Sequence, residues 1–188
     1  SVAGVVDRLN TAATGLHVAN LCMDLDAKSP AKVAEFCATS GVAPPKTQHD
    51  PNHYVKNAKG RFIDVKKAVK ATNVFPPETQ LKLAGELALA LHQNRLKGPV
   101  RLKGALRNVL EHAFDRHGGC LDFFDCPNAL GKRTESKYKG GEFLNTAGGA
   151  VGAAKLEVLL TDTFGKLTTD TRIEALAHAN DTQVCEAH

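Results

Sequence analysis

The stretch that decides the fold class is "GPVRLKGALRNVLEHAF", residues 98–114. A glycine and a proline open it, as they open many helices. Its apolar residues then recur at intervals typical of a helix and form a single stripe: Val100, Leu102, Leu106, Val109, Leu110, Ala113 and Phe114. Because Lys103, Arg107 and Glu111 fall outside this stripe, the pattern predicts an amphipathic helix with one side in a core.

Helical patterns also lie on both sides of this stretch. Residues 77–96 carry leucines around nearly the whole circumference of a helix, which is typical of a central buried helix. Residues 62–69 and 146–164 also have helical spacing, and we expect a last helix to begin near Asp170. These segments predict a main helical core over residues 60–180.

The N-terminal part predicts a pair of helices over residues 1–40. Apolar residues at helical spacing predict a first helix that continues to about Asp26, and the Ser29-Pro30 pair predicts the start of a second helix. Three prolines and no periodicity over residues 41–60 predict a long connecting loop. We therefore expect one all-α domain, 1–188, with six or seven helices.

Composition agrees with packed helices. The chain has 188 residues, enough for one domain with a full core, and is 43% hydrophobic but 5% aromatic without Trp. No apolar stretch approaches the roughly 18–20 residues that a membrane span needs, so we expect no transmembrane segment. The chain starts at Ser1 rather than Met, as expected for a processed precursor or a trimmed chain.

Charge and motifs exclude several classes of function. The net charge of +4 makes the protein mildly basic. Tyr138 is the one aromatic residue in the basic segments 97–107 and 132–139, so we do not expect a nucleic-acid partner. The sequence contains no GxSxG, GxxxxGK[ST], GxGxxG, HExxH or CxxCH motif. Standard hydrolases, P-loop proteins, Rossmann enzymes, zincins and c-type cytochromes therefore lose their main support.

The five cysteines predict two short disulfide bonds. The spacings pair Cys22 with Cys37 and Cys120 with Cys126, which leaves Cys185 as an unpaired thiol or as a link to a partner chain in a covalent oligomer. Two disulfides indicate an extracellular or otherwise oxidising compartment. Five free thiols in a reducing compartment are the alternative.

Titratable side chains are densest at residues 110–126. His112 and His117 are five residues apart, so on one helix they project roughly 140° from each other and do not share a metal ion. We interpret this stretch as a helix end, capped by Gly118 and Gly119, that opens a loop bounded by cysteines.

Three chemical alternatives remain beside this interpretation. His112, Arg116 and His117 have the residue types of a general base, a phosphate clamp and a general acid, as in ribonuclease-type toxins. His92, on an apolar helix, has the setting of a haem ligand. The histidines of the segment 49–53 are weak zinc ligands for which the sequence names no further partner.

The absence of a decisive motif favours binding over catalysis. We expect a non-enzymatic, secreted helical protein that binds a small apolar ligand or another protein, without a cofactor or metal. The ribonuclease and haem hypotheses are the alternatives.

Overall fold

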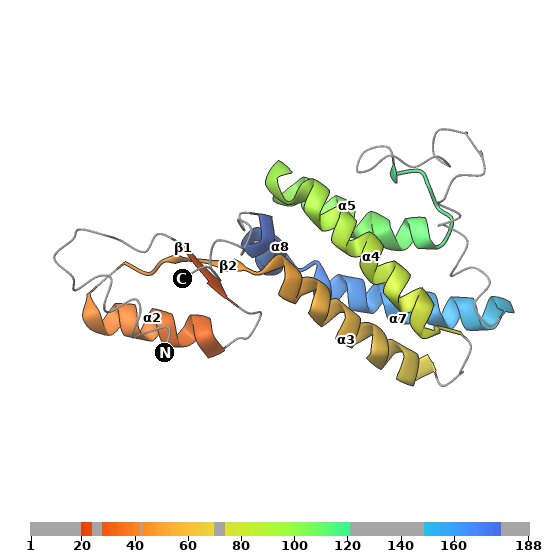
Figure 1. The fold of residues 1–188 in the computed structure, drawn as a ribbon, viewed down its shortest axis with the longest axis horizontal. Helices are drawn as coiled ribbons and strands as arrows, with labels where there is room; N and C mark the ends of the chain where they lie inside the picture. Colours follow the sequence, from red (N-terminus) through yellow and green to blue (C-terminus); the bar gives the residue numbers. More distant parts are fainter. Residues whose placement is uncertain (1–19, 24–27, 42, 70–73, 121–148, 178–188) are drawn as a thin grey trace.

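Six α-helices dominate the computed structural model, which describes residues 20–23, 28–41, 43–69, 74–120 and 149–177 (Figure 1). The elements in chain order are β1 (Asn20–Met23), α2 (Lys28–Ser40), β2 (Lys46–His49), α3 (Pro51–Val69), α4 (Pro77–Asn94), the short 3-10 helix η1 (Arg95–Lys97), α5 (Pro99–Ala113), α7 (Gly149–Leu167) and α8 (Asp170–Ala177). The predicted all-α class is confirmed. None of the helices in these ranges has both the length and the apolar content of a membrane span.

The main core lies between α3, α4, α5, α7 and α8. Helix α4 packs against α3 and α5. Helix α7 also contacts both α3 and α5, and α8 packs against α5. Phe62 of α3 lies within this core, with its ring centroid 6.1 Å from that of Phe75 and 6.0 Å from that of Phe164 in α7. The contact between Phe62 and Phe164 joins two helices that are far apart in the sequence.

Helix α5 has the predicted apolar face. Leu102, Leu106 and Ala113 are completely buried, whereas Val100 at the start of the predicted stripe is 87% exposed. The helix begins at Pro99, directly after Gly98, whose φ of +92° favours glycine. Gly98 therefore lets the chain turn from η1 into α5, so that α4 and α5 pack together.

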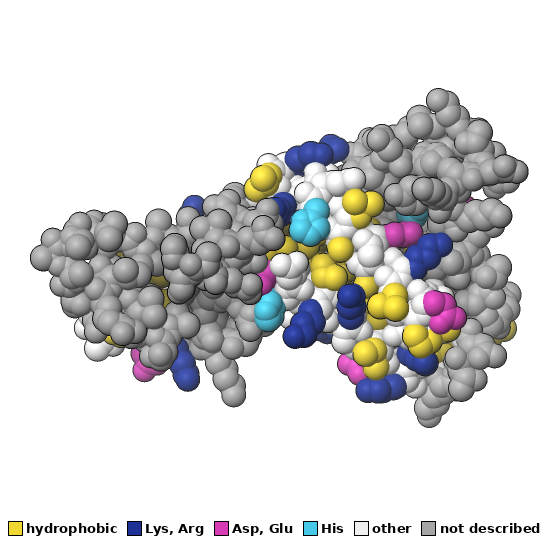
Figure 2. Space-filling view, in the orientation of Figure 1, with side chains coloured by type: hydrophobic (Ala, Val, Ile, Leu, Met, Phe, Trp, Pro, Cys, Tyr) yellow, Lys and Arg dark blue, Asp and Glu magenta, His cyan; other side chains and the backbone are white. Residues whose placement is uncertain are grey.

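Helix α4 is less buried than its leucine content predicts. Leu83, Leu87 and Leu91 are fully buried, but Leu81 is 61% and Leu89 42% exposed. The prediction of burial around the whole circumference is wrong, because packing partners cover one side of α4 only. Figure 2 shows hydrophobic side chains that alternate with lysine and arginine on the face of the bundle turned toward the viewer.

Residues 41–60 are not one long loop, which corrects the prediction. Residues Lys46–His49 form β2, and α3 begins at Pro51. The Asp50 side chain accepts a hydrogen bond from the backbone N–H of Asn52 at 2.8 Å. An aspartate cap before a proline at the first helical position is a standard start of a helix, so the local sequence contains the signal.

The predicted first helix is wrong at residues 20–23, the part of it that the structure describes. Residues Asn20–Met23 form β1, which pairs in parallel with β2 from Asn20 opposite Lys46 to Met23 opposite His49. Backbone hydrogen bonds to a distant strand thus replace those of a helix. The rest of the predicted helix, residues 2–19 and 24–26, lies outside the described residues.

Helix α2 follows the prediction closely and forms a small separate cluster. It ends at Ser40, and Gly41 follows with a φ of +67°. Val33 and Cys37 are buried together, and Phe36 packs against them. In Figure 1, α2 and the two strands lie at one end of the molecule, where β2 contacts α8 of the main bundle.

Candidate metal centre

The end of α5 determines the geometry of the site. The helix stops at Ala113, and Asp115 adopts a left-handed φ of 62°. The Asp115 N–H donates to the carbonyl of His112 at 3.1 Å, and the Arg116 N–H donates to that of Glu111 at 2.9 Å. This pair of bonds is a Schellman motif with an aspartate in the position that glycine usually takes. The predicted Gly118-Gly119 cap is therefore wrong.

The turn at Asp115 brings the two histidines together. His112 belongs to the last turn of α5, and His117 follows the reversal, so that their ring centroids are 4.9 Å apart. The expected separation of 140° does not apply, because it assumed that the helix continues through His117. The reason for expecting that the two side chains do not share a metal ion therefore no longer holds.

Cys120 completes a cluster of three potential metal ligands. Its Sγ lies 3.4 Å from Nδ1 of His112 and 3.7 Å from Nδ1 of His117. The three ligand atoms lie within 4.8 Å of one another. Cys120 is fully buried, His112 is 5% exposed, and His117 is half-buried.

These spacings fit a tetrahedral zinc ion. Zinc binds sulfur at about 2.3 Å and imidazole nitrogen at about 2.0–2.1 Å, so a tetrahedral angle places the two ligand atoms about 3.6 Å apart. The two observed sulfur-to-nitrogen distances, 3.4 and 3.7 Å, lie on either side of this value. The two histidine nitrogens lie within 4.8 Å of each other, so an ion that binds all three atoms requires the imidazole rings to move closer together.

Two neighbouring side chains, Asp115 and Asn108, form hydrogen bonds with the potential ligands that favour the binding of a cation. The Asp115 carboxylate lies 2.7 Å from Nε2 of His117 and accepts a hydrogen bond from it, so that in the neutral ring Nδ1, which faces Cys120, is the nitrogen with a free lone pair. The Asn108 amide donates to Sγ of Cys120 at 3.4 Å, a contact that stabilises a thiolate. A carboxylate behind a ligating histidine is a regular feature of zinc sites because it fixes the tautomer of the ring.

His112 is held in the neutral form that coordinates metals. Burial, together with the nearby His117 and Lys82, lowers the pKa of His112 from 6.5 to about 4, against a smaller opposing effect of Asp115. At neutral pH, no proton on His112 therefore has to be displaced by a metal ion.

No protein-family model, curated protein or solved structure matches this chain.

Arg116, the third member of the ribonuclease hypothesis, is engaged elsewhere. Its guanidinium forms ion pairs with Glu111 and, at 2.8 Å, with Glu157 of α7. It also lies 5.2 Å from the ring centre of Phe114. Arg116 thus joins the end of α5 to α7. Its guanidinium, which would hold a phosphate in a ribonuclease, is already paired with carboxylates.

The described cysteines do not form the predicted disulfide bonds. Cys37 and Cys120 are both free and buried, Cys37 in the small cluster of α2 and Cys120 beside the two histidines. Both predicted pairs, 22–37 and 120–126, are therefore corrected. Cys22 lies in β1, while Cys126 and Cys185 are outside the described residues.

The remaining predicted ligands are not in ligand-like surroundings. His92 is exposed on α4, away from the buried face that a haem would need. Nε2 of His53 lies 3.8 Å from Asp50, whose carboxylate caps α3. His49, at the end of β2, belongs to no group of three potential ligands among the described residues.

Sequence reasoning missed Cys120 as a partner of the histidines and Asp115 as the residue that orients them. The spacing His-x4-His-x2-Cys was visible, and an aspartate tolerates a left-handed conformation better than most residues do. Together these features indicate a turn after His112 that returns His117 and Cys120 to it.

Proposed function

We propose that this protein is a non-enzymatic metal-binding protein whose centre, formed by His112, His117 and Cys120, takes Zn²⁺. The observation that carries the proposal is the pair of sulfur-to-nitrogen distances, 3.4 and 3.7 Å, between Cys120 and the two histidines, which match those around a tetrahedral zinc ion. Imidazole and thiolate together are ligands that suit zinc far better than magnesium or calcium.

Burial favours a structural ion over a catalytic one. Structural zinc usually has four protein ligands and catalytic zinc three, and the three described ligands leave the fourth position unassigned. Cys120 and His112 are buried beneath the end of α5, which restricts the access of a substrate. A bound ion would fix the segment after the Asp115 turn to α5. Its binding free energy would then add to the stability of the fold.

A ribonuclease has less support from the same geometry. The two histidines do lie together, but His112, the proposed general base, is buried, and a pKa of about 4 makes it too weak a base for efficient catalysis at neutral pH. Arg116 is paired with two glutamates. The haem hypothesis for His92, and an apolar ligand or a protein partner, remain predictions.

The free thiols also change the expected compartment. The argument for an extracellular location rested on disulfide bonds, and Cys37 and Cys120 are free. A thiolate ligand is compatible with a reducing compartment, so an oxidising one is not part of this proposal. An oligomer through Cys185 stays a separate prediction.

Cobalt substitution tests the proposal. Titration of the reduced protein with Co²⁺ should give a thiolate-to-cobalt charge-transfer band and tetrahedral visible bands that saturate at one ion per chain, and Zn²⁺ should displace them. Cys120→Ser should remove the charge-transfer band, and His117→Ala should weaken binding.

Matched controls make this test specific to the site. Cys37→Ser removes another buried thiol and His92→Ala an exposed histidine, and both should leave the spectrum unchanged. A spectrum that persists in Cys120→Ser, or that disappears in Cys37→Ser, would contradict the proposed centre.

A further inference from the structure

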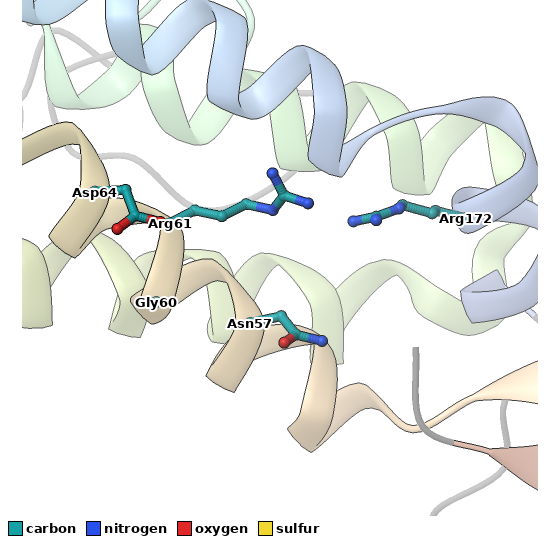
Figure 3. Close-up of a pocket in the computed structure, with 5 residues that line it drawn as sticks. All are labelled: Asn57, Gly60, Arg61, Asp64 and Arg172. Carbon is teal, nitrogen blue, oxygen red and sulfur yellow. The ribbon is translucent and has the colours of Figure 1, made fainter. Parts of the chain in front are cut away.

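A polar pocket lies between α3 and α8. It has a volume of about 410 Å³, and Figure 3 shows the residues that line it. Asn57, Gly60, Arg61 and Asp64 come from α3, and Arg172 comes from α8. Because none of these residues is apolar, the pocket suits a charged or strongly polar ligand.

The two arginines point toward each other across this pocket. Arg61 extends from α3 toward α8, and Arg172 extends from α8 in the opposite direction (Figure 3). Among the residues that the structure describes, neither guanidinium has a hydrogen-bond or ion-pair partner. Two permanently charged groups that face each other repel, so an anion between them would stabilise the arrangement.

Helix α3 adds positive charge on its side of the pocket. Helix α3 contains five lysine and arginine residues and a single acidic residue, Asp64. The carboxylate of Asp64 lies 3.4 Å from Nζ of Lys67 and is thus partly neutralised. The pocket therefore has an excess of positive charge although Asp64 lines it.

We infer that Arg61 and Arg172 form a binding site for a phosphate group. A guanidinium presents a fork of N–H donors, and a tetrahedral phosphate has oxygen atoms to accept from two forks on opposite sides. A carboxylate has its two oxygens in one plane and is already satisfied by a single fork. Two forks that converge from different helices therefore favour phosphate.

The pocket is large enough to hold a small molecule that carries a phosphate group. Ligand pockets usually have volumes of roughly 300–1,000 Å³, and this one lies within that range. Asn57 lies on the lining with both donor and acceptor atoms for the rest of such a molecule. This inference does not rest on the metal centre, which uses other residues.

Calorimetric titration with inorganic phosphate tests the site. The full chain should bind phosphate saturably, and Arg61→Gln or Arg172→Gln should weaken binding by roughly tenfold to a hundredfold, as expected for the loss of charge-assisted hydrogen bonds. Lys56→Gln removes the same charge from an exposed position on α3 and should have little effect. Arg172→Lys keeps the charge but not the fork, and it should also weaken binding.

Three results would overturn the inference. They are phosphate binding no stronger than that of chloride at equal ionic strength, equal losses in Lys56→Gln and Arg61→Gln, and acetate binding as tight as phosphate binding. Circular dichroism of each variant separates loss of binding from loss of fold. If Arg172→Gln does not fold, Arg172→Lys decides.

Discussion

Replacement of Glu86 by glutamine should stabilise the protein at alkaline pH but not at acidic pH. Glu86 lies on α4, and its Oε2 atom is buried without a hydrogen-bond partner among the described residues. Burial raises the pKa of Glu86 from 4.5 to about 7, and the nearby Lys82 only partly offsets this. The folded protein therefore holds this proton more tightly than the unfolded chain does.

The sign and the size of the effect follow from this difference. Below pH 4.5, Glu86 is mainly protonated in both the folded and the unfolded state, so its burial costs no ionisation free energy. As the pH rises from 4.5 to 7 the unfolded chain ionises first, so the free energy of unfolding decreases, and above 7 the penalty is complete. Each tenfold difference in proton affinity corresponds to about 1.4 kcal/mol, and the partial exposure of Glu86 reduces the total to roughly 2 kcal/mol.

Urea unfolding followed by circular dichroism measures this penalty. Glu86→Gln should match the parent protein at about pH 4.5 and exceed its free energy of unfolding by roughly 2 kcal/mol at about pH 8. Glu35→Gln makes the same change on the exposed side of α2 and serves as the control. A Glu86→Gln gain that is equal at both pH values, or a loss at the higher one, would refute the reasoning.

Four further substitutions test the turn at Asp115, two glycines and the core. Asp115→Gly should keep the left-handed turn but lower the affinity for zinc roughly tenfold to a hundredfold, because the carboxylate that orients His117 is lost. Unchanged affinity in a zinc competition assay would argue against that role of Asp115. Gly98→Ala, at a φ of +92°, should destabilise the protein by about 1 kcal/mol, whereas Gly85→Ala within α4 should stabilise it by about as much. Thermal unfolding midpoints of the two variants that move in the same direction would contradict this prediction. Phe62→Ala should cost about 3–5 kcal/mol in urea unfolding, and a loss below 1 kcal/mol would place the core elsewhere.

The helices of the bundle were predictable because their signal is local. The stripe of α5 follows directly from the spacing of residues such as Leu102 and Leu106, and Gly41 marks the end of α2. The start of α3 was also readable from Asp50-Pro51, but the prolines before it favoured the prediction of a loop. In these elements, neighbouring residues determine the structure.

The features that sequence reasoning missed depend on longer-range geometry. The parallel pairing of β1 with β2 joins segments on either side of α2, and no alternation in four residues indicates it. The metal centre depends on where α5 stops, and the left-handed Asp115 sets that point in the absence of a glycine. Arg61 and Arg172 meet only because α8 returns toward α3 in the folded chain.

X-ray absorption spectroscopy of the zinc-loaded protein tests the central claim most directly. The account predicts one sulfur at about 2.3 Å and two imidazole nitrogens at about 2.0–2.1 Å from the zinc, with the sulfur lost in Cys120→Ser and retained in Cys37→Ser. A zinc shell without sulfur in the parent protein, or a sulfur signal that persists in Cys120→Ser, would contradict a centre formed by His112, His117 and Cys120.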